Sequence, residues 1–276
     1  MKSHRNRTLV FLLIASQALW LASCSYERKP VESNSDLVLI RQTKDGASTL
    51  RITSEQLYAL PTFTKDFKFE ANGEDKKTKA VYLSDVLKTY LDDGVLGFWL
   101  LNCGDKYQSN FSPEQIQTAR PYLILEVEDK PLVEWLEELG HPEWGPNIIN
   151  IENTNGLLDP GHKSPWGVTD IIAVTRQQAL TGISFQNMNE STSRGLDLYL
   201  NSCASCHQSG NGITGGSVST RNLQTLSVLA KHAEAYVRKM LKDPQATNPL
   251  AVKMPGYAHW SEENISDLIA FLKSRN

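Results

Sequence analysis

The stretch Cys203-Ala204-Ser205-Cys206-His207 decides the fold of the segment around it. It contains two of the four cysteines of the chain, and the other two, Cys24 and Cys103, are isolated. The preceding segment 191–202 has apolar residues at helical spacing, so we expect the stretch to continue a helix. Positions three and four residues apart share one face of a helix. The stretch therefore predicts a helical turn that presents two thiols and one imidazole to the same ligand.

The C-x-x-C-H spacing is typical of covalent haem c attachment, in which two thiols bind the porphyrin and the histidine binds the iron. We expect Cys203 and Cys206 to hold one haem covalently and His207 to be an axial ligand. A zinc half-site would need a second ligand pair, but only the widely separated His232 and His259 follow. A thioredoxin-like pair would follow a strand in a β-α-β unit, which this segment lacks.

The second axial ligand is expected from Met254 in the segment Lys253-Met254-Pro255-Gly256-Tyr257. Three prolines between 243 and 260 break helical structure, so this segment is predicted to be an irregular loop that can fold a side chain over the haem. His259 competes with Met254, because it lies close to the same loop. Met240 and His232 lie on a helix predicted over 226–242 and are weaker candidates.

The order of motif helix, loop, middle helix, methionine loop and terminal helix resembles a class I cytochrome c over residues 190–276. This resemblance implies an all-α cytochrome c domain that transfers single electrons. If protein groups fill both axial positions, the iron has no open site, which implies a carrier and not an enzyme. In that family a proline soon after the motif often supplies the carbonyl that orients the haem histidine. Residues 208–222 contain no proline, so the partner of His207 is open.

The N-terminus is predicted to be an export signal. Lys2, Arg5 and Arg7 precede a short apolar run, 10–21, and we expect a signal peptide over residues 1–23. The stretch Leu21-Ala22-Ser23-Cys24 resembles the lipobox of bacterial lipoproteins, which implies lipid attachment at Cys24. The following Ser25 implies the outer membrane if the cell is Gram-negative. Residues 24–35 are then a tether, and the protein lies on the periplasmic side of a bacterial membrane.

Residues 36–182 alternate short β-branched runs with short helical patterns, which favours an α+β domain. Gly, Asn, Ser and Thr are common between residues 180 and 193, so we expect a linker there, at 183–189. The cytochrome c domain then follows at 190–276. The predicted strands are 37–41, 49–53, 79–83, 98–101, 122–128, 147–153 and 168–174, and the predicted helices are 54–60, 84–91 and 112–119.

The first domain resembles the molybdopterin-binding domain of sulfite oxidase-type enzymes, which implies a mixed sheet with short helices. That family binds molybdenum through a cysteine ahead of the segment corresponding to 81–87, and residues 36–80 contain none. Cys103 comes later and is expected to be a buried thiol. We therefore expect no molybdopterin. The resemblance rests on Val81-Tyr82-Leu83-Ser84-Asp85-Val86-Leu87, Gly104-Asp105-Lys106-Tyr107, Pro121-Tyr122-Leu123-Ile124-Leu125, Gly145-Pro146-Asn147-Ile148 and Trp166-Gly167-Val168.

The formal net charge of −3 favours neither nucleic acid nor a membrane surface as a partner. We expect redox proteins as partners and a membrane contact only through the N-terminal lipid. The leading hypothesis is a lipid-anchored monohaem electron carrier. The first alternative is a molybdenum-dependent periplasmic oxidoreductase that passes electrons to its own haem. The second is a haem-based sensor, which would need an open or displaceable sixth ligand.

Overall fold

The computed structural model describes residues 36–43, 46–69, 74–91, 97–153, 163–183, 188–209 and 213–275. The predicted signal peptide, the lipid-attachment residue Cys24, the tether and most of the predicted linker lie outside the described residues. By their contacts, residues Ser35–Asn276 form one compact unit, and the boundaries drawn within it from the sequence stay predictions. Across the described ranges, no helix has both the length and the apolar character needed to cross a membrane.

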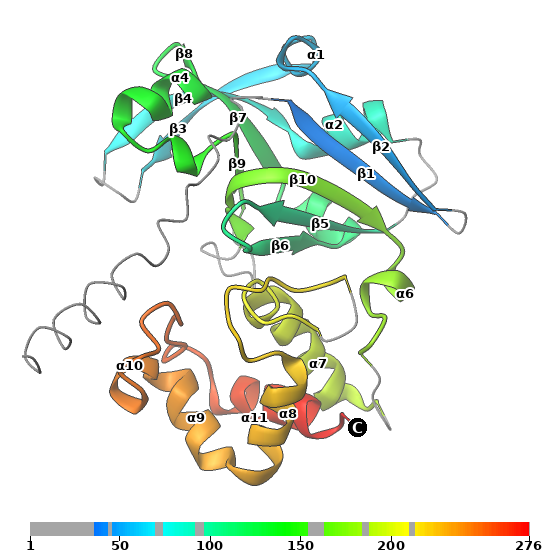
Figure 1. The fold of residues 1–276 in the computed structure, drawn as a ribbon, viewed down its shortest axis with the longest axis vertical. Coiled ribbons are helices and arrows are strands. Elements are labelled where there is room, and N and C mark those ends of the chain that lie inside the picture. The colour runs from blue at the N-terminus through cyan, green and yellow to red at the C-terminus, as the bar shows by residue number, and fades with distance from the viewer. Residues whose placement is uncertain are drawn as a thin grey trace, which may run out of the picture. The chain divides into compact units, whose positions relative to one another are not determined.

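A mixed sheet forms the first part of this unit (Figure 1). Its strands follow the order β2-β1-β10-β9-β7-β4-β3, β5 pairs with β10 and β6, and β8 pairs with β7. The β1–β10 pair is parallel, and the other pairs between described strands are antiparallel. The strands are β1 Leu37–Thr43, β2 Gly46–Ile52, β3 Thr62–Lys68, β4 Asp75–Tyr82, β5 Phe98–Cys103, β6 Gln108–Phe111, β7 Pro121–Val127, β8 Lys130–Pro131, β9 Asn147–Ile151 and β10 Trp166–Val174.

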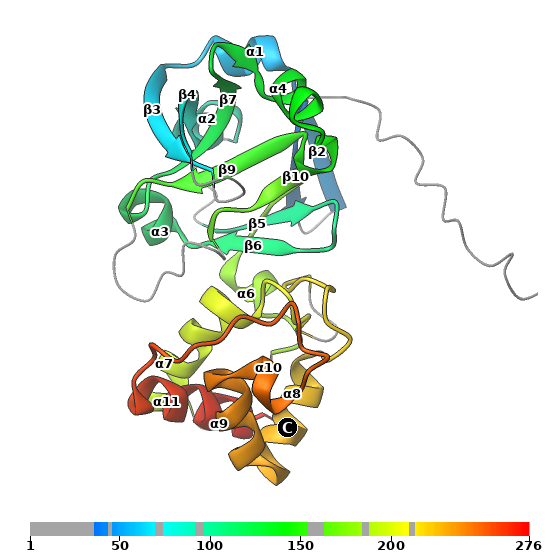
Figure 2. The ribbon, with the colours of Figure 1, turned by 90° about the vertical axis from the view of Figure 1, so that its left-hand side faces the viewer.

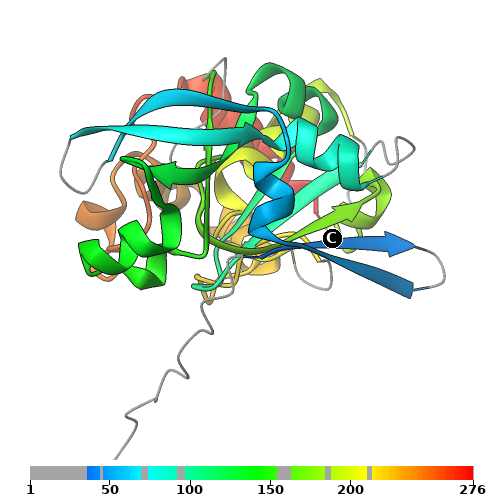
Figure 3. The same ribbon diagram turned by 90° about the horizontal axis from the view of Figure 1, so that it is seen from above.

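Short helices cover the sheet (Figure 3). Three of them begin with a capping box, in which Thr53, Ser112 or Thr175 and the glutamine three residues later bond each other's backbone N–H groups. Leu57, Val86 and Ile116 bring α1, α2 and α3 into one core cluster, and Leu132 and Leu136 bring α4 into another. The helices are α1 Ser54–Tyr58, α2 Leu83–Tyr90, α3 Pro113–Thr118, α4 Leu132–Leu139, the 3-10 helix η1 Pro142–Trp144 and α6 Arg176–Ala179.

Strand β5 is apolar along most of its length because both of its faces are covered. Trp99 and Leu101 belong to the core cluster of the sheet, whereas Phe98 and Leu100 belong to the cluster formed mainly by the C-terminal helices. Side chains alternate between the two faces of a strand, so one continuous apolar run contributes to two cores. The sheet and the C-terminal helices therefore share buried apolar surface.

The C-terminal part is helical (Figure 2). Helix α7 continues directly into the π-helical turn η2, which ends at Cys203. Helix α11 packs against α7 and α8, and Ile265, Leu268 and Leu272 lie in their shared core. The elements are α7 Glu190–Leu198, η2 Tyr199–Cys203, α8 Leu223–His232, α9 Glu234–Lys242, α10 Pro244–Thr247 and α11 Glu262–Lys273.

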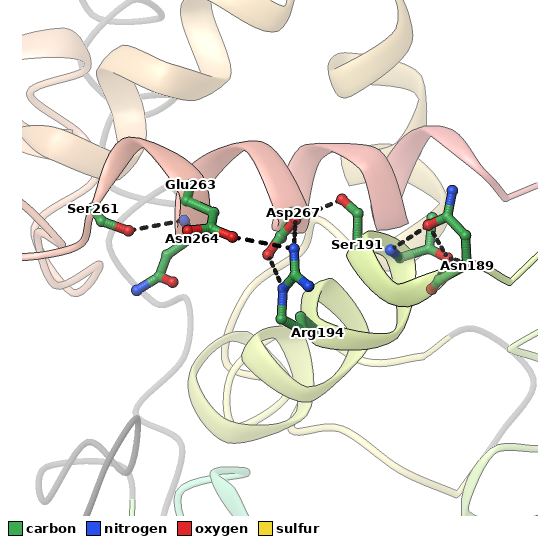
Figure 4. A network of polar contacts seen from close by, with 8 residues as sticks. Asn189, Ser191, Arg194, Ser261, Glu263, Asn264 and Asp267 are labelled. Atoms are coloured by element: carbon green, nitrogen blue, oxygen red, sulfur yellow. Dashed lines mark hydrogen bonds and ion pairs between the residues drawn. The ribbon is translucent and has the colours of Figure 1, made fainter.

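A buried carboxylate joins α7 to α11 (Figure 4). Asp267 is 5% exposed in its side chain and accepts hydrogen bonds from Arg194 Nε at 2.6 Å and Ser191 Oγ at 2.5 Å. The Arg194 guanidinium holds the pKa of Asp267 below its ordinary value. A lowered folded-state pKa stabilises the protein above the unfolded pKa of about 3.9, and this contribution is lost as the pH falls through the lowered value.

Most predicted elements are confirmed. Each predicted strand overlaps an observed one, and the predicted helices of the first part correspond to α1, α2 and α3. The helix predicted over 226–242 is wrong as a single element, because it breaks at Ala233 into α8 and α9. Alanine has the highest helix propensity, so the local sequence does not explain the break. Both α8 and α9 contact α11, and the break lets each of them pack against it. The expected irregular segment 243–260 contains one short helix, α10. Strands β3, β6 and β8 and helix α4 were not predicted.

Helix crossing between α7 and α11 requires Gly195, because a Cβ atom there would lie 2.0 Å from Asp267 O and 2.7 Å from Phe271 Cβ. We expect Gly195→Ala to force the helices apart and to lower the free energy of unfolding by about 2 kcal/mol or more, measured by denaturant titration. Gly104→Ala is the matched control, since its Cβ would meet its nearest neighbour, Thr169 Cγ2, at 3.9 Å. Equal stability of the two variants would contradict this packing.

Candidate functional site

The turn after η2 brings the motif residues onto one short segment. The carbonyl oxygen of Cys203 accepts hydrogen bonds from Cys206 N at 3.2 Å and His207 N at 2.9 Å. Both cysteines are free thiols of intermediate burial. The predicted turn is therefore present, and its backbone bonds keep Cys203, Cys206 and His207 adjacent.

The two thiols lie in an environment that keeps them protonated. Burial, together with the neighbouring Cys206, raises the pKa of Cys203 to about 12. Burial and the charge of Asp105 raise the pKa of Cys206, and the charge of Lys253 opposes this.

His207 is fixed by a carbonyl that the sequence did not reveal. Its Nδ1 lies 2.5 Å from the backbone oxygen of Arg221. A carbonyl only accepts hydrogen bonds, so Nδ1 must carry the proton and Nε2 keeps its lone pair. Burial lowers the pKa of His207, which favours the neutral ring. The Tyr199 hydroxyl also donates to the backbone oxygen of His207 at 2.6 Å. Nε2 is thus the nitrogen suited to binding a metal.

The loop that contains Met254 lies between α10 and α11, and hydrogen bonds join it to α9 and to η2. Tyr257 N donates to Leu241 O at 2.6 Å, and the Tyr257 hydroxyl donates to Ser202 O, next to Cys203, at 3.3 Å. Met254 is partly buried against the hydrophobic cluster that Cys203 also contacts. An open pocket of about 390 Å³ lies beside the loop, and Met254 is among the residues that line it.

The competing ligand candidates lie in different environments. His232 is exposed at the end of α8, and His259 is exposed beside Tyr257 and Trp260. Met240 is buried within α9, but it does not belong to the cluster that Met254 and Cys203 contact. Among these side chains, Met254 is the one that is half-buried against the hydrophobic cluster that Cys203 also contacts.

Cys103 lies apart from the motif in its packing. It ends β5 within the core of the sheet, 7% exposed, whereas Cys203 packs against the helical cluster. Burial raises the pKa of the Cys103 thiol well above its ordinary value. Cys103 is therefore a buried thiol of the sheet, as its sequence context indicated.

Strand β6 contacts the motif and the turn η2 before it, which was not predicted from the sequence. Gln108 N donates to Ser205 O at 3.1 Å, and Asn110 Nδ2 donates to Leu200 O at 2.7 Å. These bonds join residues about a hundred positions apart, and no local sequence pattern reports such a pairing. Their only sequence signal is the polar character of residues 108–110, which are buried in the structure.

Comparison with known proteins supports the C-terminal assignment. The family model for cytochrome c matches residues 192–276, a range that begins in α7 and includes the C-x-x-C-H turn and Met254. No curated protein matches the chain. Members of this family bind haem c through such a motif and transfer electrons. Residues 192–276 of the chain therefore form a cytochrome c domain. This domain supports the conclusion that the protein binds haem and transfers electrons.

Proposed function

We propose that this protein is a monohaem c-type electron carrier in which Cys203 and Cys206 hold the haem covalently. The observation that carries the proposal is the bond from His207 Nδ1 to the Arg221 carbonyl, because it leaves Nε2 free to bind iron on the same turn as two free thiols. When bound, haem c supplies an iron that alternates between the ferrous and ferric states.

Met254 is proposed as the second axial ligand. Its partial burial beside the cluster that Cys203 contacts supports this choice over the exposed His232 and His259. The bond from Tyr257 to Ser202 would hold the loop close to the motif helix. With His207 on one side and Met254 on the other, the protein would leave no position for a substrate, which favours a carrier over an enzyme or a sensor.

The first domain is proposed to be a cofactor-free descendant of the sulfite oxidase-like fold. Its mixed sheet with short helices is compatible with that origin. The packing of Cys103 in the core of the sheet supports the absence of a molybdenum ligand at that residue.

Iron without molybdenum in the purified protein is the expected metal content, and equal amounts of both metals would favour the oxidoreductase alternative.

Covalent attachment predicts that haem stays with the chain after denaturation. Cys203→Ala and Cys206→Ala should each lose at least one thioether link and show weaker haem-dependent peroxidase staining on a denaturing gel. Cys103→Ala is the control, and its staining should match the unmodified protein. Full staining of a Cys203→Ala/Cys206→Ala double variant would contradict the proposed attachment.

Axial ligation by Met254 predicts that the iron of the reduced protein has no vacant coordination position. Met254→Ala should open the sixth position, so the ferrous variant should bind carbon monoxide rapidly and completely, as followed by its Soret absorption. His259→Ala is the matched control from the same loop and should remain largely unreactive. Rapid, complete binding by the unmodified protein at neutral pH, or by His259→Ala alone, would contradict Met254 as the ligand.

Lipid attachment at Cys24 is also proposed, with a location on the periplasmic side of a bacterial membrane, the outer membrane in a Gram-negative cell. The supporting observation is the Leu21-Ala22-Ser23-Cys24 sequence after a short apolar run. Labelling with a radioactive fatty acid in a bacterial host should mark the chain, and Cys24→Ser should abolish the label and release the protein from membranes. Unchanged labelling of Cys24→Ser would refute the assignment.

A further inference from the structure

Residues 213–222, which precede α8, are bonded both to the motif turn and to the sheet. This loop contains Gly215 and Gly216, and glycine permits many backbone conformations. The same segment contains Arg221, whose carbonyl bonds His207 Nδ1. The position of that carbonyl therefore depends on how firmly the loop is held.

The side chain of Gln108 binds this loop from the sheet. Its Nε2 donates to Ile213 O at 3.1 Å and to Asn102 Oδ1 at 2.8 Å, and its Oε1 accepts from Gly215 N at 2.6 Å. Gln108 is 6% exposed, so these bonds form away from bulk solvent. A buried amide with both donors and its acceptor in use is costly to disturb.

Backbone hydrogen bonds also join this loop to the sheet and to the motif turn. Ser217 N donates to Lys106 O at 2.9 Å, and Gly216 N donates to Ala204 O at 2.8 Å. A Cβ atom on Gly216 would lie 2.0 Å from Ser205 O and 2.8 Å from Lys106 O. The loop is thus packed backbone to backbone between the haem-binding turn and the turn that joins β5 to β6. Only glycine fits at this point.

We propose that Gln108 is a positioning residue for the haem ligand His207. Through Ile213 and Gly215 it holds the loop that carries the Arg221 carbonyl, together with the bond from Ser219 N to Cys206 O, so the first domain contributes to the position of the hydrogen bond to Nδ1. This inference rests on the proposed haem function. A firm bond to Nδ1–H makes the imidazole a stronger ligand, which favours ferric iron. A looser loop should therefore raise the reduction potential.

Gln108→Leu in the full-length holoprotein tests the proposal, because it keeps about the same side-chain volume, adds no charge and removes the hydrogen bonds of Gln108 to Ile213 and Gly215. We expect its reduction potential to rise, with the ferrous-to-ferric ratio at a fixed potential increasing by up to about tenfold. We also expect the His207 Nδ1–H signal in the nuclear magnetic resonance spectrum to exchange faster with solvent. Covalent haem content should not change.

Gln115→Leu is the matched control, because it also removes a side-chain amide without adding charge. Gln115 Nε2 also joins the first domain to the motif helix, through Asn201 Oδ1 at 2.7 Å, but it does not contact the loop. Its potential should equal that of the unmodified protein. An unchanged potential and an unchanged Nδ1–H signal in a folded Gln108→Leu would overturn the proposal, as would equal shifts in the two variants.

Hydrogen exchange in the unmodified protein provides a test that does not depend on a variant folding. The amide protons of Gly215 and Ser217 should be protected, because their partners, Gln108 Oε1 and Lys106 O, belong to the first domain. Exchange of both amides at the rate of an open loop would overturn the proposal. A protein without haem would instead refute the proposed function, while the exchange measurement would still test the contact.

Discussion

The hydrogen bond between His207 Nδ1 and the Arg221 carbonyl is the constraint on which the proposed site depends. It fixes the tautomer of the ring, sets its orientation and leaves Nε2 as the free nitrogen. A proline carbonyl often has this role in the cytochromes that the domain resembles, and this chain uses a different residue at the far end of a glycine-containing loop. The orientation of the His207 imidazole therefore depends on how well this loop is ordered.

The sheet bonds that loop in addition to the motif turn, and it ties the two parts of the protein together. Strand β5 contributes alternate side chains to the core of the sheet and to the helical core, and Gln108 at the start of β6 bonds the loop directly. Separation of the parts would expose the apolar surface of Phe98 and Leu100 and leave buried polar groups without partners. This shared surface explains why residues Ser35–Asn276 form one compact unit.

The sequence predicts those features whose causes are local. The C-x-x-C-H spacing is contained in a short window, and the structure has the hydrogen-bonded turn that it predicts, directly after η2. Strand β6 was missed because its buried polar residues do not alternate with apolar ones. The Arg221 carbonyl could not be identified, since any residue type supplies a backbone oxygen. The contacts of Gln108 depend on the tertiary fold and have no local signature.

The pyridine haemochrome spectrum of the protein, produced in a host that matures c-type cytochromes, distinguishes covalently attached haem from haem that is bound without thioether links. Haem bound through two thioether links gives the absorption band of a c-type haem, and we predict that band with one haem per chain. A band typical of haem with intact vinyl groups, or a colourless protein, would contradict the account.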